Sequence, residues 1–114
     1  MSEPRTIFIG RKPLHAYIRA VLMSMTDGDR KLTLVARGNA IVTAVNVAEV
    51  CRRRNGILAS QLPDEVNMTG VEIGTEEVER DNGMGNVSVI RIGLEGLGEM
   101  NLVERDDKTD DSEE

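Results

Sequence analysis

The chain has 114 residues, of which 39% are hydrophobic and 2% aromatic, and its formal net charge is −6. This length corresponds to one domain with an aliphatic core, and the single cysteine, Cys51, excludes an internal disulfide and fits a reducing, intracellular setting. Because Phe8 and Tyr17 are the only aromatic residues, the composition argues against aromatic platforms on which unpaired bases stack.

Charge is divided unevenly along the chain. Residues 1–54 hold ten Lys and Arg against four Asp and Glu, whereas residues 55–103 hold two against nine and residues 104–114 hold two against seven. The electrostatic field over one part of a protein can be opposite in sign to its total charge. The negative total therefore does not exclude an anionic partner that binds the N-terminal half. No signal peptide is evident, and no apolar run approaches the roughly 20 residues of a membrane span. We therefore expect a cytoplasmic protein with no membrane partner.

The first predicted strand, residues 5–10, ends at Gly10 and leads through Arg11 and Lys12 to Pro13. Proline suits the first position of a helix because its φ is already helical and it has no N–H group to satisfy. A helix N-terminus carries partial positive charge and free N–H groups, and two cations beside it favour a bound phosphate. A solvated basic turn without a ligand is the alternative interpretation.

The period of the apolar residues predicts the other elements. Apolar residues separated by alternating steps of three and one positions indicate a helix, and alternation of apolar with polar residues indicates a strand. The expected elements are a helix from residue 14 to the turn at 27–29, a strand at 31–36, a helix at about 39–54, a linker at 57–65, and strands at 66–79 and 87–94. Gly56 is expected to cap the second helix. The core stripe of that helix is expected at Ile41, Ala44, Val45, Ala48 and Cys51, with Val42, Val47 and Val50 widening it. Cys51, on this stripe, is expected to be a buried thiol.

The last two strands are predicted to form a long, projecting hairpin. Asn82 and Gly83 lie between them, and Asn-Gly between β-rich segments is a strong hairpin signal. Side-chain parity changes at Gly70, which indicates a β-bulge. The complete order predicts an α/β fold (an α+β two-layer sandwich), βαβαββ, in which a four-stranded mixed sheet carries two helices on one face. The helices leave one face of the sheet, or part of it, uncovered, and a homodimer is expected to cover it.

No catalytic or metal-binding constellation is visible in the sequence. His15 and Cys51 are the only residues of their types, and no carboxylates stand with them at ligand spacing. Glu77 and Glu79 share one face of a strand and offer at most a weak cation site, whereas a solvated acidic arm is the simpler interpretation. The sequence therefore predicts a protein that is not an enzyme and that uses no cofactor or metal.

Cations stand at the strand ends of the N-terminal half. Arg37 and Gly38 end the second predicted strand, as Gly10 and its basic pair end the first. Turns after two parallel strands lie at one sheet edge, so Arg11, Lys12 and Arg37 are expected to form one patch. Such a patch binds phosphate backbone with little sequence information. Residues 52–54, three arginines, either complement the dipole of the second helix or present one or two side chains to a ligand.

Four segments, in order, resemble motifs of the Alba family of small archaeal chromatin proteins. They are Ile-Gly-Arg-Lys-Pro at 9–13, Ala-Arg-Gly-Asn-Ala-Ile at 36–41, Leu-Pro-Asp at 62–64 and Val-Ser-Val-Ile-Arg-Ile at 87–92. The resemblance implies a βαβαββ homodimer that binds double-stranded DNA and RNA without sequence preference and is associated with the chromosome. It assigns binding to Arg11, Lys12, Arg37 and Asn39, with Arg80 in the hairpin, and it makes Lys12 the candidate for acetylation.

The sequence departs from the family pattern chiefly in its acidic residues. The predicted hairpin holds five acidic residues against Arg80 and Arg91, so we expect a phosphate groove to repel it and the basic turns to carry more of the binding. Arg11 replaces the first lysine of the usual family pair, which leaves only Lys12 for acetylation. Gln61 replaces an aromatic residue found in many members, which argues against dimer–dimer packing through that contact.

The expected domains are a nucleic-acid-binding domain at 1–95 and an acidic, disordered C-terminal tail at 96–114. The run at 104–114 is expected to compete with nucleic acid for the basic patch. The alternative function is that of an RNA-binding ribonucleoprotein or protein-interaction subunit with weak DNA binding, whose acidic hairpin meets a basic protein. A third interpretation attributes the excess of acidic residues to a salty cytoplasm.

Overall fold

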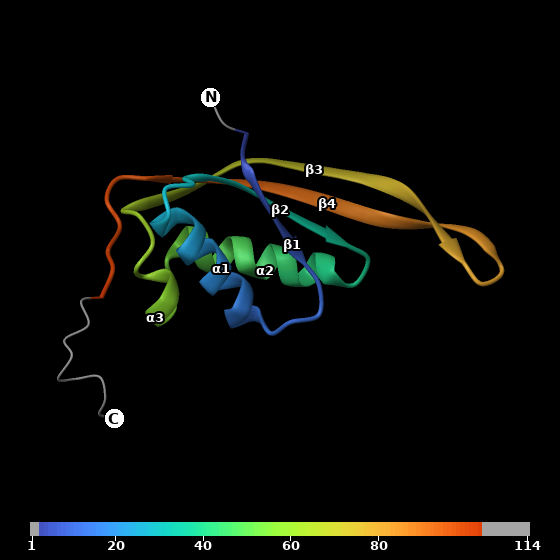
Figure 1. The fold of residues 1–114 in the computed structure, drawn as a ribbon, viewed down its shortest axis with the longest axis horizontal. Coiled ribbons are helices and arrows are strands. Elements are labelled where there is room, and N and C mark those ends of the chain that lie inside the picture. The colour runs from blue at the N-terminus through green and yellow to red at the C-terminus, as the bar shows by residue number, and fades with distance from the viewer. Residues whose placement is uncertain (1–2, 104–114) are drawn as a thin grey trace.

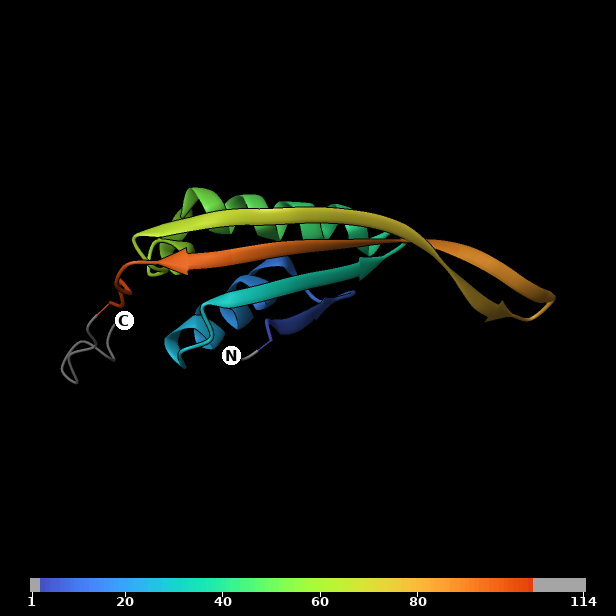
Figure 2. The same cartoon turned by 90° about the horizontal axis from the view of Figure 1, so that it is seen from above.

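The structure, a computed structural model, describes residues 3–103. Its elements are β1 (Arg5–Ile9), α1 (Leu14–Thr26), β2 (Lys31–Arg37), α2 (Ala40–Arg53), α3 (Gly56–Ala59), β3 (Glu65–Arg80) and β4 (Gly83–Leu97). The sheet order is β1-β2-β4-β3, with β1 parallel to β2 and the other two pairings antiparallel. Both long helices lie on one face of this sheet (Figures 1 and 2). The predicted βαβαββ order and mixed sheet are confirmed.

The core lies between the two long helices and the sheet face that they cover. On that face Leu34 of β2 pairs with Ile92 of β4, and the neighbouring pairs are equally aliphatic. These side chains and those of α1 and α2 that meet them are almost fully buried. Burial of each large aliphatic side chain stabilises the fold by about 1.5–3 kcal/mol. Cys51 is among the buried residues, so the predicted buried thiol is confirmed, and burial raises its pKa to about 12.

The ends of both long helices refine the predictions. α1 begins at Leu14, as expected from the apolar spacing, but Pro13 is the N-cap and not the first helical residue, because it keeps an extended backbone (ψ 155°) and its carbonyl accepts the first helical hydrogen bond. α2 ends at Arg53, and the left-handed cap is Arg54 (φ 53°) rather than Gly56. Gly56 instead opens the short helix α3, which occupies part of the expected linker. The boundary predictions at these positions were therefore wrong by one to a few residues.

The buried face of α2 is also rotated from the predicted stripe. Val47 is buried, whereas Val45, which the spacing places on the core stripe, is exposed together with Val42. An apolar side of α2 is thus left open to solvent.

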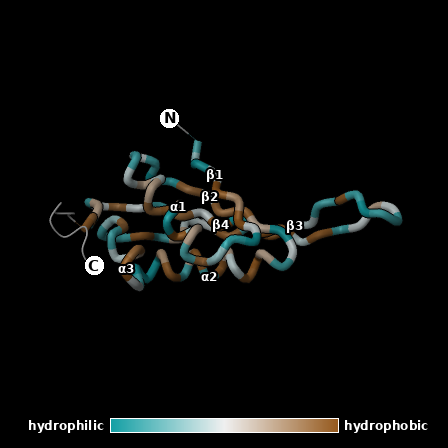
Figure 3. The backbone as a smooth tube through the Cα atoms, turned by 60° about the horizontal axis from the view of Figure 1, so that its bottom comes forward, coloured by the Kyte–Doolittle hydropathy of each residue, from teal (hydrophilic) through white to brown (hydrophobic). Residues whose placement is uncertain are grey.

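The hairpin of β3 and β4 extends well beyond the helices (Figures 1 and 2). Its strands are longer than predicted: Arg80 pairs with Gly83, so the turn consists of Asp81 and Asn82 alone. The pairing register shifts between Met68 and Gly70, which confirms the predicted bulge. The tip of the hairpin is hydrophilic (Figure 3).

The chain continues in contact with the fold beyond residue 95, the expected domain boundary. β4 runs to Leu97, and Asn101 then donates hydrogen bonds to the backbone carbonyls of Gln61 (2.9 Å) and Leu62 (3.0 Å). The acidic run at 104–114 lies outside the described residues, and the predictions made for it stay predictions. Within residues 3–103, no helix is long and apolar enough to cross a membrane.

Candidate nucleic-acid interface

The corner between β1 and α1 is held in place by a buried tyrosine. The hydroxyl oxygen of Tyr17 accepts hydrogen bonds from the backbone N–H groups of Gly10 (2.7 Å) and Lys12 (2.9 Å). Tyr17 itself is only 6% exposed, so its ring is anchored in the core. In the described chain, neither Arg11 nor Lys12 forms an ion pair, and both side chains are exposed. The backbone of this basic turn is therefore fixed while its two cations stay available.

Sequence reasoning did not find this role for Tyr17, although one signal pointed to it. Tyr17 is the only tyrosine, and it lies on the apolar stripe of the first helix. A buried tyrosine hydroxyl normally finds a hydrogen-bond partner, and the nearest backbone without helical or strand partners is the turn that precedes the helix. The partner atoms could not be chosen without the tertiary structure.

The corner between β2 and α2 depends on a glycine. Gly38 has a left-handed backbone (φ 58°), its N–H donates to the Ser88 carbonyl (2.9 Å), and its carbonyl accepts from Ile41 (3.0 Å). Left-handed backbone costs little only for glycine, so Gly38 lets the strand turn sharply into the helix between Arg37 and Asn39. Asn39 is exposed and its side chain forms no capping hydrogen bond, so its amide is available for a ligand.

The two corners meet at one depression of about 400 Å³. It lies at the carboxyl ends of the parallel strands β1 and β2, where such strands commonly present binding residues. Arg11, Arg37 and Asn39 line it together with Phe8, Val35 and neighbouring residues. Lys12 lies beside Arg11 in the same turn but does not line the depression. We call Arg11, Lys12, Arg37 and Asn39 the turn patch.

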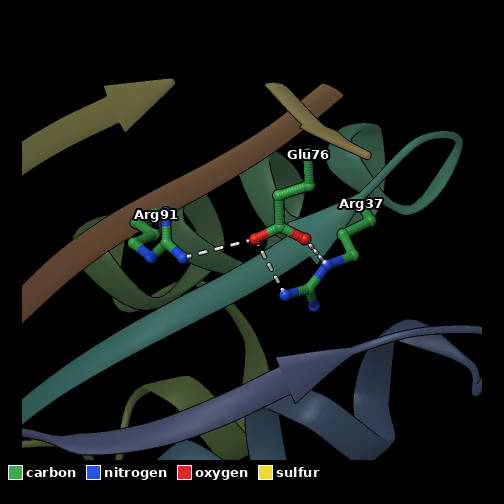
Figure 4. Close-up of polar contacts among 3 residues, drawn as sticks. All are labelled: Arg37, Glu76 and Arg91. Atoms are coloured by element: carbon green, nitrogen blue, oxygen red, sulfur yellow. Dashed lines mark hydrogen bonds and ion pairs between the residues drawn. The ribbon is translucent and has the colours of Figure 1, made fainter. Parts of the chain in front are cut away.

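One cation of the turn patch is tied to the hairpin. Arg37 donates from Nε to one carboxylate oxygen of Glu76 (2.6 Å) and from a terminal nitrogen to the other (3.2 Å), and Arg91 lies 3.6 Å from the same carboxylate (Figure 4). The hydrogen bonds from Arg37 hold the pKa of Glu76 below its ordinary value and raise that of Arg37. This contact could not be foreseen from the sequence pattern, because it joins residues on β2 and β3.

The remaining predicted cations are placed apart from the turn patch. Arg80 lies at the far end of the hairpin and donates a hydrogen bond to the Asn86 carbonyl (3.2 Å). At the end of α2, Arg52 is paired with Glu49 (2.8 Å), and Arg54 donates to the Ser60 carbonyl (2.7 Å). Two of the three arginines in this triplet therefore make contacts within the fold.

Known proteins resemble this chain over most of its length. The sequence profile of the Alba family matches residues 5–61. The chain is 39% identical to "DNA/RNA-binding protein Alba 1" of Archaeoglobus fulgidus and 37% identical to "DNA/RNA-binding protein Alba" of Methanothrix thermoacetophila, over 82% of this chain and 97% and 98% of those proteins. The solved structure of Alba from Thermoplasma volcanium matches with a TM-score of 0.67 and 31% identity, covering 80% of this chain and 99% of that one.

Proposed function

The chain belongs to the Alba family, and on that premise we propose that it is a non-enzymatic protein that binds double-stranded DNA and RNA through the turn patch, without sequence preference. The observation that carries the proposal is the convergence of Arg11, Arg37 and Asn39 on one depression at the ends of two parallel strands. The curated relatives are named for binding DNA and RNA, which is the chemistry that exposed guanidinium and ammonium groups favour.

The residues of the turn patch support backbone binding rather than base reading. Arg11 and Lys12 lie on a short, pinned turn, and contacts of this kind to phosphate oxygens position a protein without selecting a sequence. Arg80 is proposed as a secondary contact from the hairpin. Lys12 is the residue at which acetylation would remove one of these charges, because arginine cannot undergo that change.

We propose that the protein is a homodimer formed through an exposed apolar strip. The strip consists of Val42 and Val45 on α2 and of Val71 and Ile73 on β3, and Ile73 is 80% exposed. Val71 and Ile73 pair with Ile92 and Ile90, so they lie on the helix side of the sheet, where α2 packs against β3. A self-complementary apolar surface of this kind is typical of a two-fold dimer.

A second candidate function is favoured by the charge of the hairpin. Among the residues that the structure describes, Glu72, Glu77, Glu79 and Asp81 form no ion pair, so the projecting arm is a negative surface. In this alternative the protein is a ribonucleoprotein or protein-interaction subunit, and the arm contacts a basic protein. A pull-down from nuclease-treated native lysate distinguishes the two, because a partner retained without nucleic acid favours the alternative.

A titration series tests the main proposal. Gel shifts with two duplex DNAs of unrelated sequence and one duplex RNA, each at several salt concentrations, should give similar affinities that fall linearly on logarithmic axes as salt rises. Strong preference for one DNA sequence, or affinity independent of salt, would contradict backbone binding. On the same basis, attraction to the phosphate backbone of DNA, we propose that the protein is cytoplasmic and associated with the chromosome.

A further inference from the structure

The two aromatic residues of the chain have opposite environments. Tyr17 is buried beneath the first basic turn, whereas Phe8 on the edge strand β1 is 65% exposed. Phe8 pairs with Val35 of β2, on the sheet face opposite the helices, and both residues line the same depression as Arg11 and Arg37. The one exposed aromatic ring of the described residues therefore lies inside the proposed nucleic-acid site, and it offers a single stacking surface although the aromatic-poor composition argues against such surfaces.

This combination of groups has a specific chemistry. An exposed phenyl ring offers a flat apolar face, and the free amide of Asn39 offers a donor and an acceptor. The guanidinium of Arg11 offers charge for phosphate, and that of Arg37 does so when phosphate displaces Glu76. An aromatic ring beside cations is how proteins hold unpaired nucleotides, because the base stacks on the ring and the backbone meets the charges. The interior of an intact duplex presents no free base face to such a ring.

The depression has the size that a nucleotide requires. Its volume of about 400 Å³ lies within the range of roughly 300–1,000 Å³ that small-molecule sites occupy. Val35, which is 5% exposed, contributes apolar lining together with Phe8. Asn39 and Ala40, at the N-terminus of the 14-residue helix α2, form part of its wall. A helix N-terminus adds partial positive charge on the side where a phosphate would lie.

We propose that the depression binds an unpaired nucleotide of a bulged or frayed nucleic acid, with the base stacked on Phe8 and the adjacent phosphates contacted by Arg11 and Arg37. The inference rests on the proposed function and narrows it, because it gives the protein a preference for nucleic acid with an extruded base over a perfect duplex. Stacking tolerates any base, so this preference is for structure and not for sequence.

The test compares two versions of one duplex, either intact or with a single bulged 2-aminopurine, in RNA and in DNA. Phe8→Leu keeps an apolar strand residue but removes the ring, Phe8→Tyr keeps the ring, and Met23→Leu changes a similarly exposed apolar residue on α1. The wild type, Phe8→Tyr and Met23→Leu should bind the bulged duplex more tightly than the intact one and change the fluorescence of the 2-aminopurine. Phe8→Leu should lose about 5- to 100-fold in affinity for the bulged duplex and less than about two-fold for the intact one.

Several results would overturn this inference without overturning the proposed function. Equal affinity of the wild type for bulged and intact duplexes would do so, as would a Phe8→Leu effect of the same size on both. If Phe8→Leu shifted the oligomeric state in sedimentation velocity, Phe8 would be a residue of a protein interface and the inference would be wrong. Failure of the proposed function has a different signature, because the wild type would then bind neither duplex with the expected salt dependence. A preference for the RNA or the DNA bulge identifies which polymer supplies the nucleotide.

Discussion

Glu76 accepts both available hydrogen bonds of one side of the Arg37 guanidinium, from Nε at 2.6 Å and from a terminal nitrogen at 3.2 Å. This bidentate geometry is the one that an arginine would otherwise offer to a phosphate. The acidic hairpin thus occupies a cation of the turn patch, and a phosphate must compete with Glu76 for Arg37. Because the ion pair is half-exposed, it is expected to be weak enough for a nucleic-acid phosphate to displace Glu76 from Arg37.

Removing this competitor should strengthen binding. We expect Glu76→Gln to raise affinity for duplex DNA about two- to five-fold, the range expected when an exposed ion pair is released, and to steepen the logarithmic salt dependence by about one. Glu77→Gln is the matched control, since it removes the same charge from the next residue, which forms no ion pair within residues 3–103. If both variants bind equally well in a titration, the gain reflects net charge and not release of Arg37.

The pKa of Glu76 reports the same contact directly. The hydrogen bonds from Arg37 lower it from the ordinary value of 4.5. Because the folded-state pKa is the lower one, the ion pair stabilises the fold above pH 4.5 and the stabilisation is lost as pH falls through the lowered pKa. NMR titration of the Glu76 carboxyl should show the lowered pKa in the wild type and a return toward 4.5 in Arg37→Gln. An ordinary pKa in the wild type would show that the pair does not form in solution.

Tyr17 should control both stability and binding. Tyr17→Phe leaves the N–H groups of Gly10 and Lys12 without their acceptor, and an unsatisfied partly buried donor costs about 1–3 kcal/mol. We expect a lower free energy of urea unfolding, faster hydrogen exchange at these two amides, and weaker DNA binding because the turn is no longer held. Unchanged exchange at both amides would contradict the pinning role.

The apolar strip is tested by placing a charge in it. Ile73→Glu should convert the dimer to a monomer in sedimentation equilibrium, because a buried carboxylate at an apolar interface has no partner. Met84→Glu, at an exposed apolar residue near the hairpin tip, carries the same charge change outside the strip and should leave the dimer intact. A monomeric wild type, or a dimeric Ile73→Glu variant, would exclude this interface.

Local patterns were sufficient to predict most of the fold. Each of the correctly predicted features lies within about ten residues of sequence. These features are the apolar stripe of α1, the alternation in β2, the corners at Gly10 and Gly38, and the bulge near Gly70. These features depend on backbone preference and side-chain period, which a single sequence displays. The convergence of Arg11 with Arg37 followed from the parallel pairing of their strands.

The contacts that refine the site could not be predicted in this way. Glu76 faces Arg37 only because Thr69 is the extra residue in the β3–β4 ladder. A one-residue shift in register moves every side chain to the other face, so without the bulge Glu77 would lie on the face of Arg37. The exposure of Val45 likewise depends on which side of α2 the rest of the fold covers, and the apolar spacing of one helix does not contain that information.

The central claim is that the turn patch, and not the hairpin, carries most of the nucleic-acid binding. The most direct measurement is the logarithmic salt dependence of duplex DNA affinity for Arg11→Gln/Lys12→Gln compared with Arg80→Gln. We predict that the double variant binds at least about ten-fold more weakly at low salt and that its slope falls by about two, one for each lost phosphate contact. Arg80→Gln should change the slope by less than about 0.5. A double variant with the wild-type slope, or a larger loss in Arg80→Gln, would contradict the account.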